Sequence, residues 1–103
     1  MSETIKSILP EDKIREYCAT QPILRLSVFG SALRDELTPE SDIDLLVEYR
    51  PGATVTLLTL AGHEIDLGEL LGRKVDLRMP GELHDSFRQR VLDSARLIYE
   101  TKL

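Results

Sequence analysis

The stretch VFGSALRDELTPESDIDLLVEY, residues 28–49, decides the fold prediction because it places two aspartates at the start of an apolar run. In a β-strand, alternate side chains point to the same face, about 6–7 Å apart along the backbone. Asp42 and Asp44 therefore share one face, and the apolar residues that alternate with them share the other. Two carboxylates about 5 Å apart repel by roughly 1 kcal/mol in water and about 3 kcal/mol in a partly buried site. A central strand with this pattern indicates a positive partner for the two aspartates.

A hard cation is one such partner. Mg²⁺ binds oxygen ligands, takes one or two carboxylates, and fills its other positions with water and substrate phosphates. Two Mg²⁺ ions about 3.5–4 Å apart would fit between carboxylates at this spacing. The alternative is that Asp42 caps the turn after Ser41 and that Asp44 faces solvent. The two aspartates alone leave both interpretations open.

Gly30-Ser31, at the end of the preceding apolar run, favours a phosphate site. Glycine at the end of a strand permits a turn whose amides face an anion, and a helix that follows adds its positive end. Ser31 would add a hydroxyl donor. A Gly-Ser pair followed after ten residues by Asp-x-Asp should arise by chance in roughly one chain of this length per thousand.

Asp76 is the candidate for a third carboxylate. It lies between Val75 and Leu77, where an unpaired charge would be costly to bury. If residues 75–77 form a strand beside residues 43–49, Asp76 completes a cluster of three acidic side chains. The alternative is an aspartate on an edge strand that faces water.

The rest of the pattern predicts one α/β domain over residues 1–103, with a small mixed sheet flanked by helices. Gly72 is expected to end the longest helix. Ordered along the chain, the expected elements are a helix at 10–20, a strand at 23–29, a short helix at 31–36, a strand at 43–49, a helix at 54–71, a strand at 75–77, a helix at 82–94 and an edge strand at 97–99.

Composition narrows the class of protein. The chain has 103 residues, 42% of them hydrophobic and 30% charged, which is typical of a globular domain. A net charge of −5 argues against nucleic acid as the direct ligand, since phosphate backbones are bound by clusters of basic residues. A single cysteine excludes an internal disulfide and indicates a reducing compartment. With no apolar run of about 18 residues and no signal-peptide pattern, we expect a cytoplasmic protein without a membrane span.

One cysteine and two histidines are expected to have structural rather than catalytic roles. Cys18 follows a helical pattern and is expected to be a small core residue. His63 and His84 have no partners at metal-ligand spacing, so we expect surface or boundary positions for both.

Gly30-Ser31, Asp42-Ile43-Asp44 and Val75-Asp76-Leu77 together resemble the minimal nucleotidyltransferase family, a small branch of the DNA polymerase β-like superfamily. The resemblance spans residues 23–99. It implies that Asp42 and Asp44 hold two magnesium ions. It also implies that Asp76 binds the ion nearer the acceptor and helps to deprotonate the acceptor hydroxyl.

The same resemblance assigns the nucleotide-binding residues. Gly30 and Ser31 would cradle the β- and γ-phosphates of ATP. Arg34 matches an arginine of the family pattern, and its guanidinium would reach phosphate. Asp35 departs from the pattern, because it stands where the family commonly has glycine.

The implied reaction is attack of an acceptor hydroxyl on the α-phosphorus of ATP, with release of pyrophosphate. Chains of this size and pattern resemble the antitoxins of HEPN/MNT toxin–antitoxin pairs, and the implied acceptor is a tyrosine of the HEPN RNase toxin. Because Asp35 departs from the family pattern, a second interpretation stays open, in which the antitoxin neutralises the toxin by binding alone. A third interpretation is nucleotide transfer to a small molecule or RNA, which the lack of a basic groove disfavours.

Overall fold

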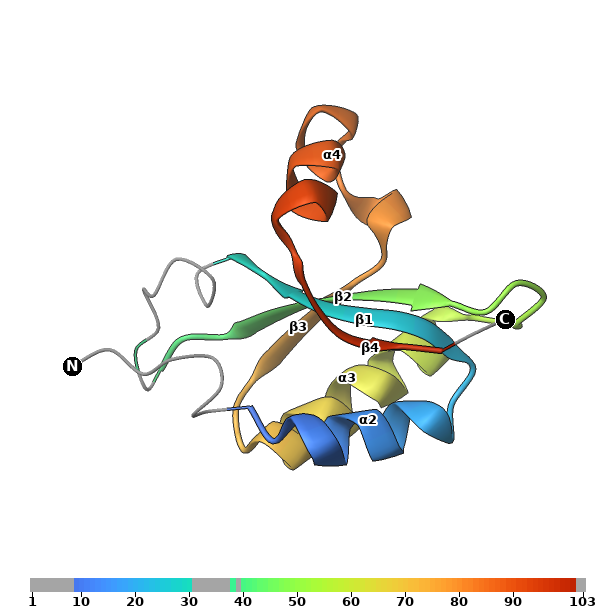
Figure 1. The fold of residues 1–103 in the computed structure, drawn as a ribbon, viewed down its shortest axis with the longest axis vertical. Helices are drawn as coiled ribbons and strands as arrows, with labels where there is room; N and C mark the ends of the chain where they lie inside the picture. Colours follow the sequence, from blue (N-terminus) through green and yellow to red (C-terminus); the bar gives the residue numbers. More distant parts are fainter. Residues whose placement is uncertain (1–8, 31–37, 39, 102–103) are drawn as a thin grey trace.

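The computed structural model describes residues 9–30, 38 and 40–101. Four strands form one sheet in the order β3-β2-β1-β4 (Figure 1). Strand β1 pairs with β2 and β4 in antiparallel fashion, whereas β2 and β3 are parallel. The elements, in chain order, are α2 (Glu11–Ala19), β1 (Ile23–Phe29), β2 (Ile43–Tyr49), α3 (Leu57–Leu71), β3 (Val75–Arg78), η2 (Pro80–Glu82), α4 (Asp85–Ser94) and β4 (Arg96–Glu100). The predicted mixed sheet flanked by helices is confirmed.

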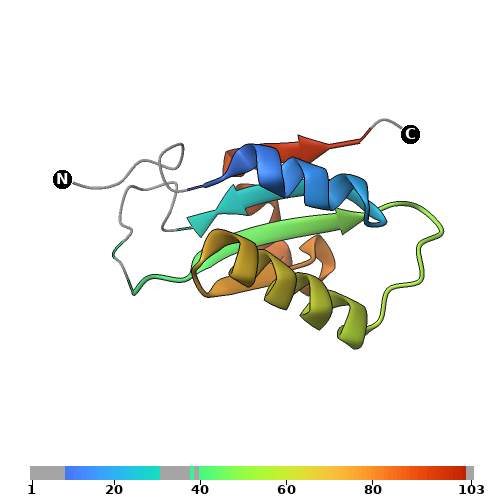
Figure 2. The same cartoon turned by 90° about the horizontal axis from the view of Figure 1, so that it is seen from below.

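Helices α2 and α3 lie side by side on one face of the sheet, whereas α4 stands on the opposite face (Figures 1 and 2). The main core fills the space beneath α2 and α3, and the side chains of Ile43, Leu45 and Val47 are fully buried in it. Leu46 points the other way, into a smaller core beneath α4. The alternation predicted for residues 43–49 is therefore confirmed, and Asp44 belongs to the α4 face.

Two helices begin later than the sequence predicted, because local caps define their first turns. Helix α3 begins after Thr56, whose hydroxyl accepts from the Thr59 amide at 3.2 Å while the Thr59 hydroxyl accepts from the Thr56 amide. It ends at Gly72, which has φ 66° and is the predicted left-handed cap. Helix α4 begins after His84, whose Nδ1 accepts from the Ser86 amide.

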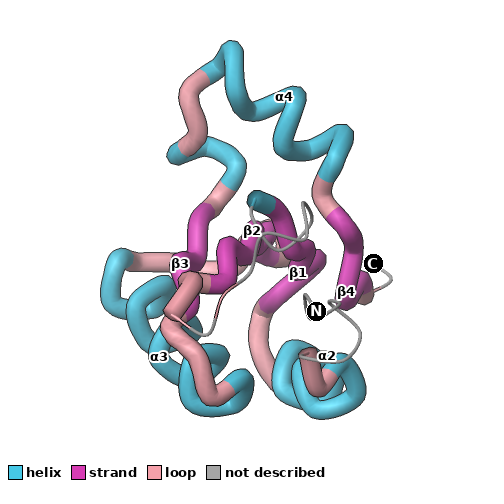
Figure 3. Tube along the Cα trace, turned by 90° about the vertical axis from the view of Figure 1, so that its left-hand side faces the viewer, coloured by secondary structure: helices cyan, strands magenta, loops and turns pink. Residues whose placement is uncertain are grey.

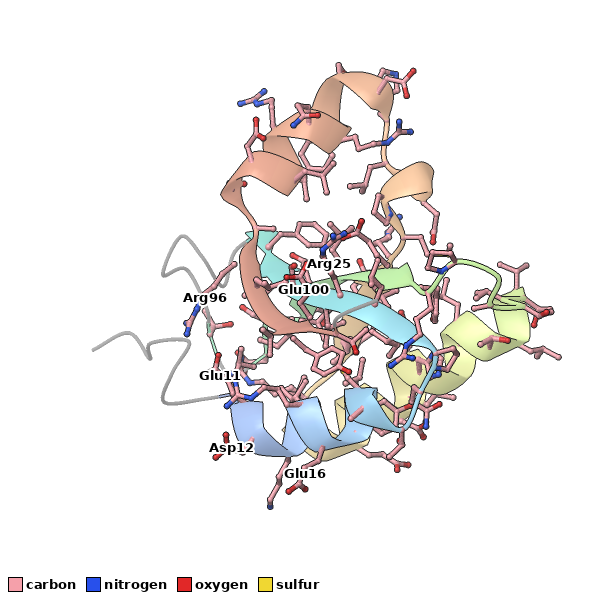
Figure 4. All side chains as sticks on the ribbon, turned by 45° about the vertical axis from the view of Figure 1, so that its right-hand side comes forward. Glu11, Asp12, Glu16, Arg25, Arg96 and Glu100 are labelled. Atoms are coloured by element: carbon pink, nitrogen blue, oxygen red, sulfur yellow. The ribbon has the colours of Figure 1, made fainter. Side chains whose placement is uncertain are left out.

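Side-chain contacts hold the edge strands in place. On β3, the Leu77 amide donates to Glu64 Oε2 of α3 at 2.8 Å. The Glu64 carboxylate thus accepts a hydrogen bond from one backbone N–H of this edge strand. On β4, Arg96 pairs with Glu11 of α2 at 3.2 Å, and Glu100 pairs with Arg25 of β1 (Figure 4). Among the described residues, no helix combines the length and the hydropathy that a membrane span requires.

The surface or boundary position predicted for His63 is wrong. His63 is 5% exposed, and its ring stacks on Tyr49 with 5.5 Å between ring centroids. Its Nδ1 is 2.8 Å from the Tyr49 hydroxyl, and its Nε2 is 3.0 Å from Gln21 Oε1. Burial lowers the pKa of His63, with an opposing contribution from Asp66. The prediction failed because both hydrogen-bond partners lie far away in sequence.

Candidate functional site

The parallel pairing of β2 with β3 sets Asp44 directly beside Asp76 in the strand register. Residues in register on neighbouring strands present their side chains on the same face of a sheet. Both aspartates line the same cavity, and the Asp76 side chain is 37% exposed. The expected pairing of residues 75–77 with residues 43–49 is thus confirmed. Asp76 does lie on an edge strand, but its carboxylate belongs to the cavity shared with Asp44.

Gly30 brings the end of β1 against the Asp44 carboxylate. It has φ 77°, a left-handed conformation that side chains with a Cβ rarely adopt. Phe29 is the register partner of Asp44, so Gly30 follows directly after that pair. A Cβ added at Gly30 would lie 3.1 Å from Asp44 Cγ and closer still to Asp44 Oδ2. Glycine is therefore required for the backbone angle and also for the close approach of the carboxylate.

The cavity holding these residues has a volume of about 730 Å³ and lies between the sheet and α4. One wall carries Gly30 and the two aspartates, and the other is formed by residues of η2 and α4. Figure 3 shows α4 on the side of the sheet away from α2 and α3. Phe87 of α4 faces this cavity with 49% of its surface exposed. The lining residues are Phe29, Gly30, Asp44, Asp76, Arg78, Glu82, Leu83, His84, Phe87, Arg90, Val91 and Ser94. No local pattern in the sequence predicts that η2 and α4 pack over the aspartates, so their lining residues were not predicted.

Asp42 is not among the residues that line this cavity. Its Oδ2 is 3.9 Å from Lys74 Nζ, and its side chain is 43% exposed. The contact follows from the strand register, because Ile43 pairs with Val75 and the residues before them are neighbours. Within the described residues, no three His, Cys, Asp or Glu side chains are grouped so that they would hold a metal ion. The joint binding of metal by Asp42, Asp44 and Asp76 therefore stays a prediction.

Arg78 is the positive partner of the Asp76 carboxylate. Its Nε donates to Asp76 Oδ1 at 3.0 Å, and its Nη2 donates to Asp76 Oδ2 at 3.4 Å. The hydrogen bond and charge of Asp76 raise the pKa of Arg78, with smaller contributions from Glu82 and Asp44. Arg78 was not predicted as a site residue, although its position two residues after Asp76 on a strand places it on the same face.

Three residues named from the sequence, Ser31, Arg34 and Asp35, lie outside the described residues, as does the short helix predicted at 31–36. The roles predicted for Ser31 and Arg34 in phosphate binding remain predictions.

The described residues fit a hard divalent cation. Asp44 and Asp76 supply carboxylate oxygens on one wall of an open cavity, and Mg²⁺ uses one or two carboxylates while its other ligands are water and phosphate. The Gly30 turn lies in the same cavity, where backbone and phosphate can approach closely. The arrangement suits a metal-assisted reaction on a phosphate ester.

Comparisons with known proteins agree with this chemistry. A family model described as a nucleotidyltransferase domain matches residues 11–98. The protein adenylyltransferase MntA of Thermococcus cleftensis is 36% identical to this chain over 87% of this chain and 88% of its own length. A toxin–antitoxin crystal structure with AMP-PNP has a similar fold, with a TM-score of 0.74 and 22% identity over 91% of this chain and 76% of that one. A complex of a tri-AMPylated Shewanella oneidensis HEPN toxin with its MNT antitoxin matches with a TM-score of 0.64 and 20% identity, over 88% of this chain and 70% of that one. These two structures indicate a shared fold.

Proposed function

The chain belongs to the nucleotidyltransferase domain family, and from this membership we propose that it is an antitoxin that transfers AMP from ATP to a hydroxyl of a HEPN-type RNase toxin. The resemblance noted in the sequence is thereby confirmed at the level of the family. The proposal goes further, to Mg²⁺ as the cofactor and a tyrosine as the acceptor.

One observation carries the proposal. The Gly30 turn touches the Asp44 carboxylate, and Asp44 stands in register with Asp76 on the wall of one cavity. A left-handed glycine at this contact lets backbone, carboxylates and a bound phosphate lie close together. A chain that needed only a packed sheet would not require a glycine pressed against an acidic side chain.

The proposed reaction forms a bond between the acceptor oxygen and the α-phosphorus of ATP. The bond from that phosphorus to pyrophosphate breaks, and pyrophosphate leaves with the electron pair. Asp44 and Asp76 would hold the metal from adjacent strands, and Asp42 would join them after leaving Lys74. Asp76 would also accept the proton of the acceptor hydroxyl. Bound Mg²⁺ would polarise the phosphate and offset its charge.

The partner is inferred from the relatives. The Thermococcus cleftensis relative is named a protein adenylyltransferase, and the Shewanella oneidensis complex contains a HEPN toxin carrying AMP. A protein acceptor also suits this chain, whose cavity opens between one helix and the sheet. An acidic surface of net charge −5 would complement a basic RNase.

The test is incubation of the purified chain with ATP, Mg²⁺ and the HEPN-type protein encoded beside it, followed by intact mass measurement. The wild type should add whole AMP units to the partner, and the Asp44→Asn, Asp76→Asn double variant should not. A matched control replaces the exposed aspartates Asp12 and Asp93 with asparagine, which removes the same charge outside the cavity. Full AMP transfer by the Asp44/Asp76 variant contradicts the proposal.

The same experiment separates the proposal from neutralisation by binding alone. The ion pairs of Asp42 with Lys74 and of Asp76 with Arg78 are the observations that favour this second function, because they occupy carboxylates that the metal would need. Under that function, the double variant would still inhibit the RNase, the partner would gain no mass, and chelation of divalent metal would change nothing.

A further inference from the structure

We propose that Arg78 is an exchangeable counter-ion of the nucleotide-binding site, which occupies Asp76 until a metal–nucleotide complex displaces it. This inference rests on the proposed function, because it assigns a role to a residue beside the proposed metal ligands. Divalent metal alone should therefore bind weakly beside Asp76, and nucleotide should bring the metal in.

The strand geometry places Arg78 for this role. Residues 76 and 78 of β3 share one face, and Arg78 is the register partner of Leu46, two residues beyond Asp44. The guanidinium turns back along β3 to reach both oxygens of Asp76, at 3.0 and 3.4 Å. Two parallel donor contacts of this kind match the fork of a guanidinium to a carboxylate. The contact is therefore specific in geometry, although the Arg78 side chain remains 47% exposed.

The charges around Arg78 come from three elements. Asp44 of β2, Asp76 of β3 and Glu82 of η2 all act on its guanidinium, and all four residues line the cavity. The Arg78 guanidinium thus offsets part of the charge of these carboxylates, and a second arginine, Arg90 of α4, also lines the cavity. Asp42 and Asp76 each have a basic partner, Lys74 and Arg78, and these positive charges reduce the repulsion among the aspartates.

A guanidinium and a metal ion compete for the same oxygens. Both Asp76 oxygens accept from Arg78, so a metal ion must share or replace those contacts. A bound triphosphate offers Arg78 a second partner of matching geometry, since guanidinium groups also bind phosphate through paired donors. Nucleotide therefore releases Asp76 and gives Arg78 a new anion in a single exchange.

The first test measures Mn²⁺ binding without nucleotide, by electron paramagnetic resonance of the free ion. Arg78→Met should bind Mn²⁺ roughly tenfold more tightly than the wild type, because a positive charge about 5 Å from a divalent ion is removed in a water-like medium. Arg15→Met is the control, since it removes the same charge from an exposed ion pair on α2. Equal or weaker Mn²⁺ binding by Arg78→Met, or no Mn²⁺ binding by either protein, overturns the inference.

The second test measures the affinity for AMP-PNP in the presence of Mg²⁺. Arg78→Met should bind the analogue several-fold more weakly, and Arg78→Lys should lie between the variant and the wild type, since an ammonium keeps the charge without the fork. Unchanged AMP-PNP affinity in Arg78→Met contradicts transfer of Arg78 to the triphosphate. AMP transfer to the partner is a separate readout: if the wild type transfers none while the two binding results hold, the reaction fails and the role of Arg78 stands.

Discussion

Replacing Gly30 with alanine would put a methyl group against the Asp44 carboxylate. Gly30 has φ 77°, and the added Cβ would lie 3.1 Å from Asp44 Cγ and 3.3 Å from Asp44 Cβ. Either the end of β1 or the Asp44 side chain must move. Because Asp44 is held in the β2 strand between its neighbours, we expect its carboxylate to turn away from Gly30.

The loss of stability in Gly30→Ala has two parts, and the same substitution at Gly52 measures one of them separately. A left-handed backbone costs alanine about 1–2 kcal/mol, and overpacking adds roughly 1–3 kcal/mol. Gly52 has φ 84° but nothing within 4 Å of an added Cβ, so Gly52→Ala carries the first cost alone. At about 4–8 °C per kcal/mol for a domain of this size, Gly52→Ala should lower Tm by about 4–16 °C. Gly30→Ala should lower it by at least about 4 °C more.

The two variants should differ more in activity than in stability. A displacement of about 1 Å in a reacting group can cost roughly 100-fold in rate. Gly30→Ala should therefore lose about 100-fold in AMP transfer to the partner, whereas Gly52→Ala should stay within about twofold of the wild type below its Tm. Thermal unfolding followed by circular dichroism and intact mass of the partner provide the two measurements. If Gly30→Ala and Gly52→Ala transfer AMP at equal rates, the close contact between Gly30 and Asp44 has no catalytic importance.

Two further predictions concern stability. The lowered pKa of His63 means that the unfolded chain takes up a proton before the folded chain does, so the free energy of unfolding should fall as pH drops below the ordinary value of 6.5. Urea unfolding at about pH 7.5 and about pH 5.5 should show a smaller loss for His63→Gln, and an equal loss would refute the assignment. Glu64→Ala should cost about 1–2 kcal/mol, because the Leu77 amide loses a charged acceptor at 2.8 Å. Glu64→Gln keeps an oxygen there and should recover most of that loss in the same urea measurement; identical midpoints for the two variants would contradict this reasoning.

The elements of the fold that depend on near neighbours were predictable from the sequence. The strands at 23–29 and 43–49 were expected and found at the same residues, since alternation of apolar side chains is a local signal. The Gly72 cap followed from glycine chemistry. The predicted starts of α3 and α4 were less accurate. The apolar pattern extends beyond the first residue of each helix, whereas the first residue is set by a cap, such as the reciprocal hydrogen bonds between Thr56 and Thr59.

The sequence by itself determined the family and the face that Asp44 occupies, and it indicated a glycine turn at position 30. Each of these depends on residue types at fixed spacing. Alternation of side chains along a strand and the conformational freedom of glycine determine the local geometry from that spacing. The tertiary structure alone decided that Asp44 stands beside Asp76, that α4 forms the opposite wall of their cavity, and that His63 is buried against Tyr49 and Gln21. Those facts depend on strand register and on contacts between distant segments, and no local pattern encodes which distant segment will pack against which.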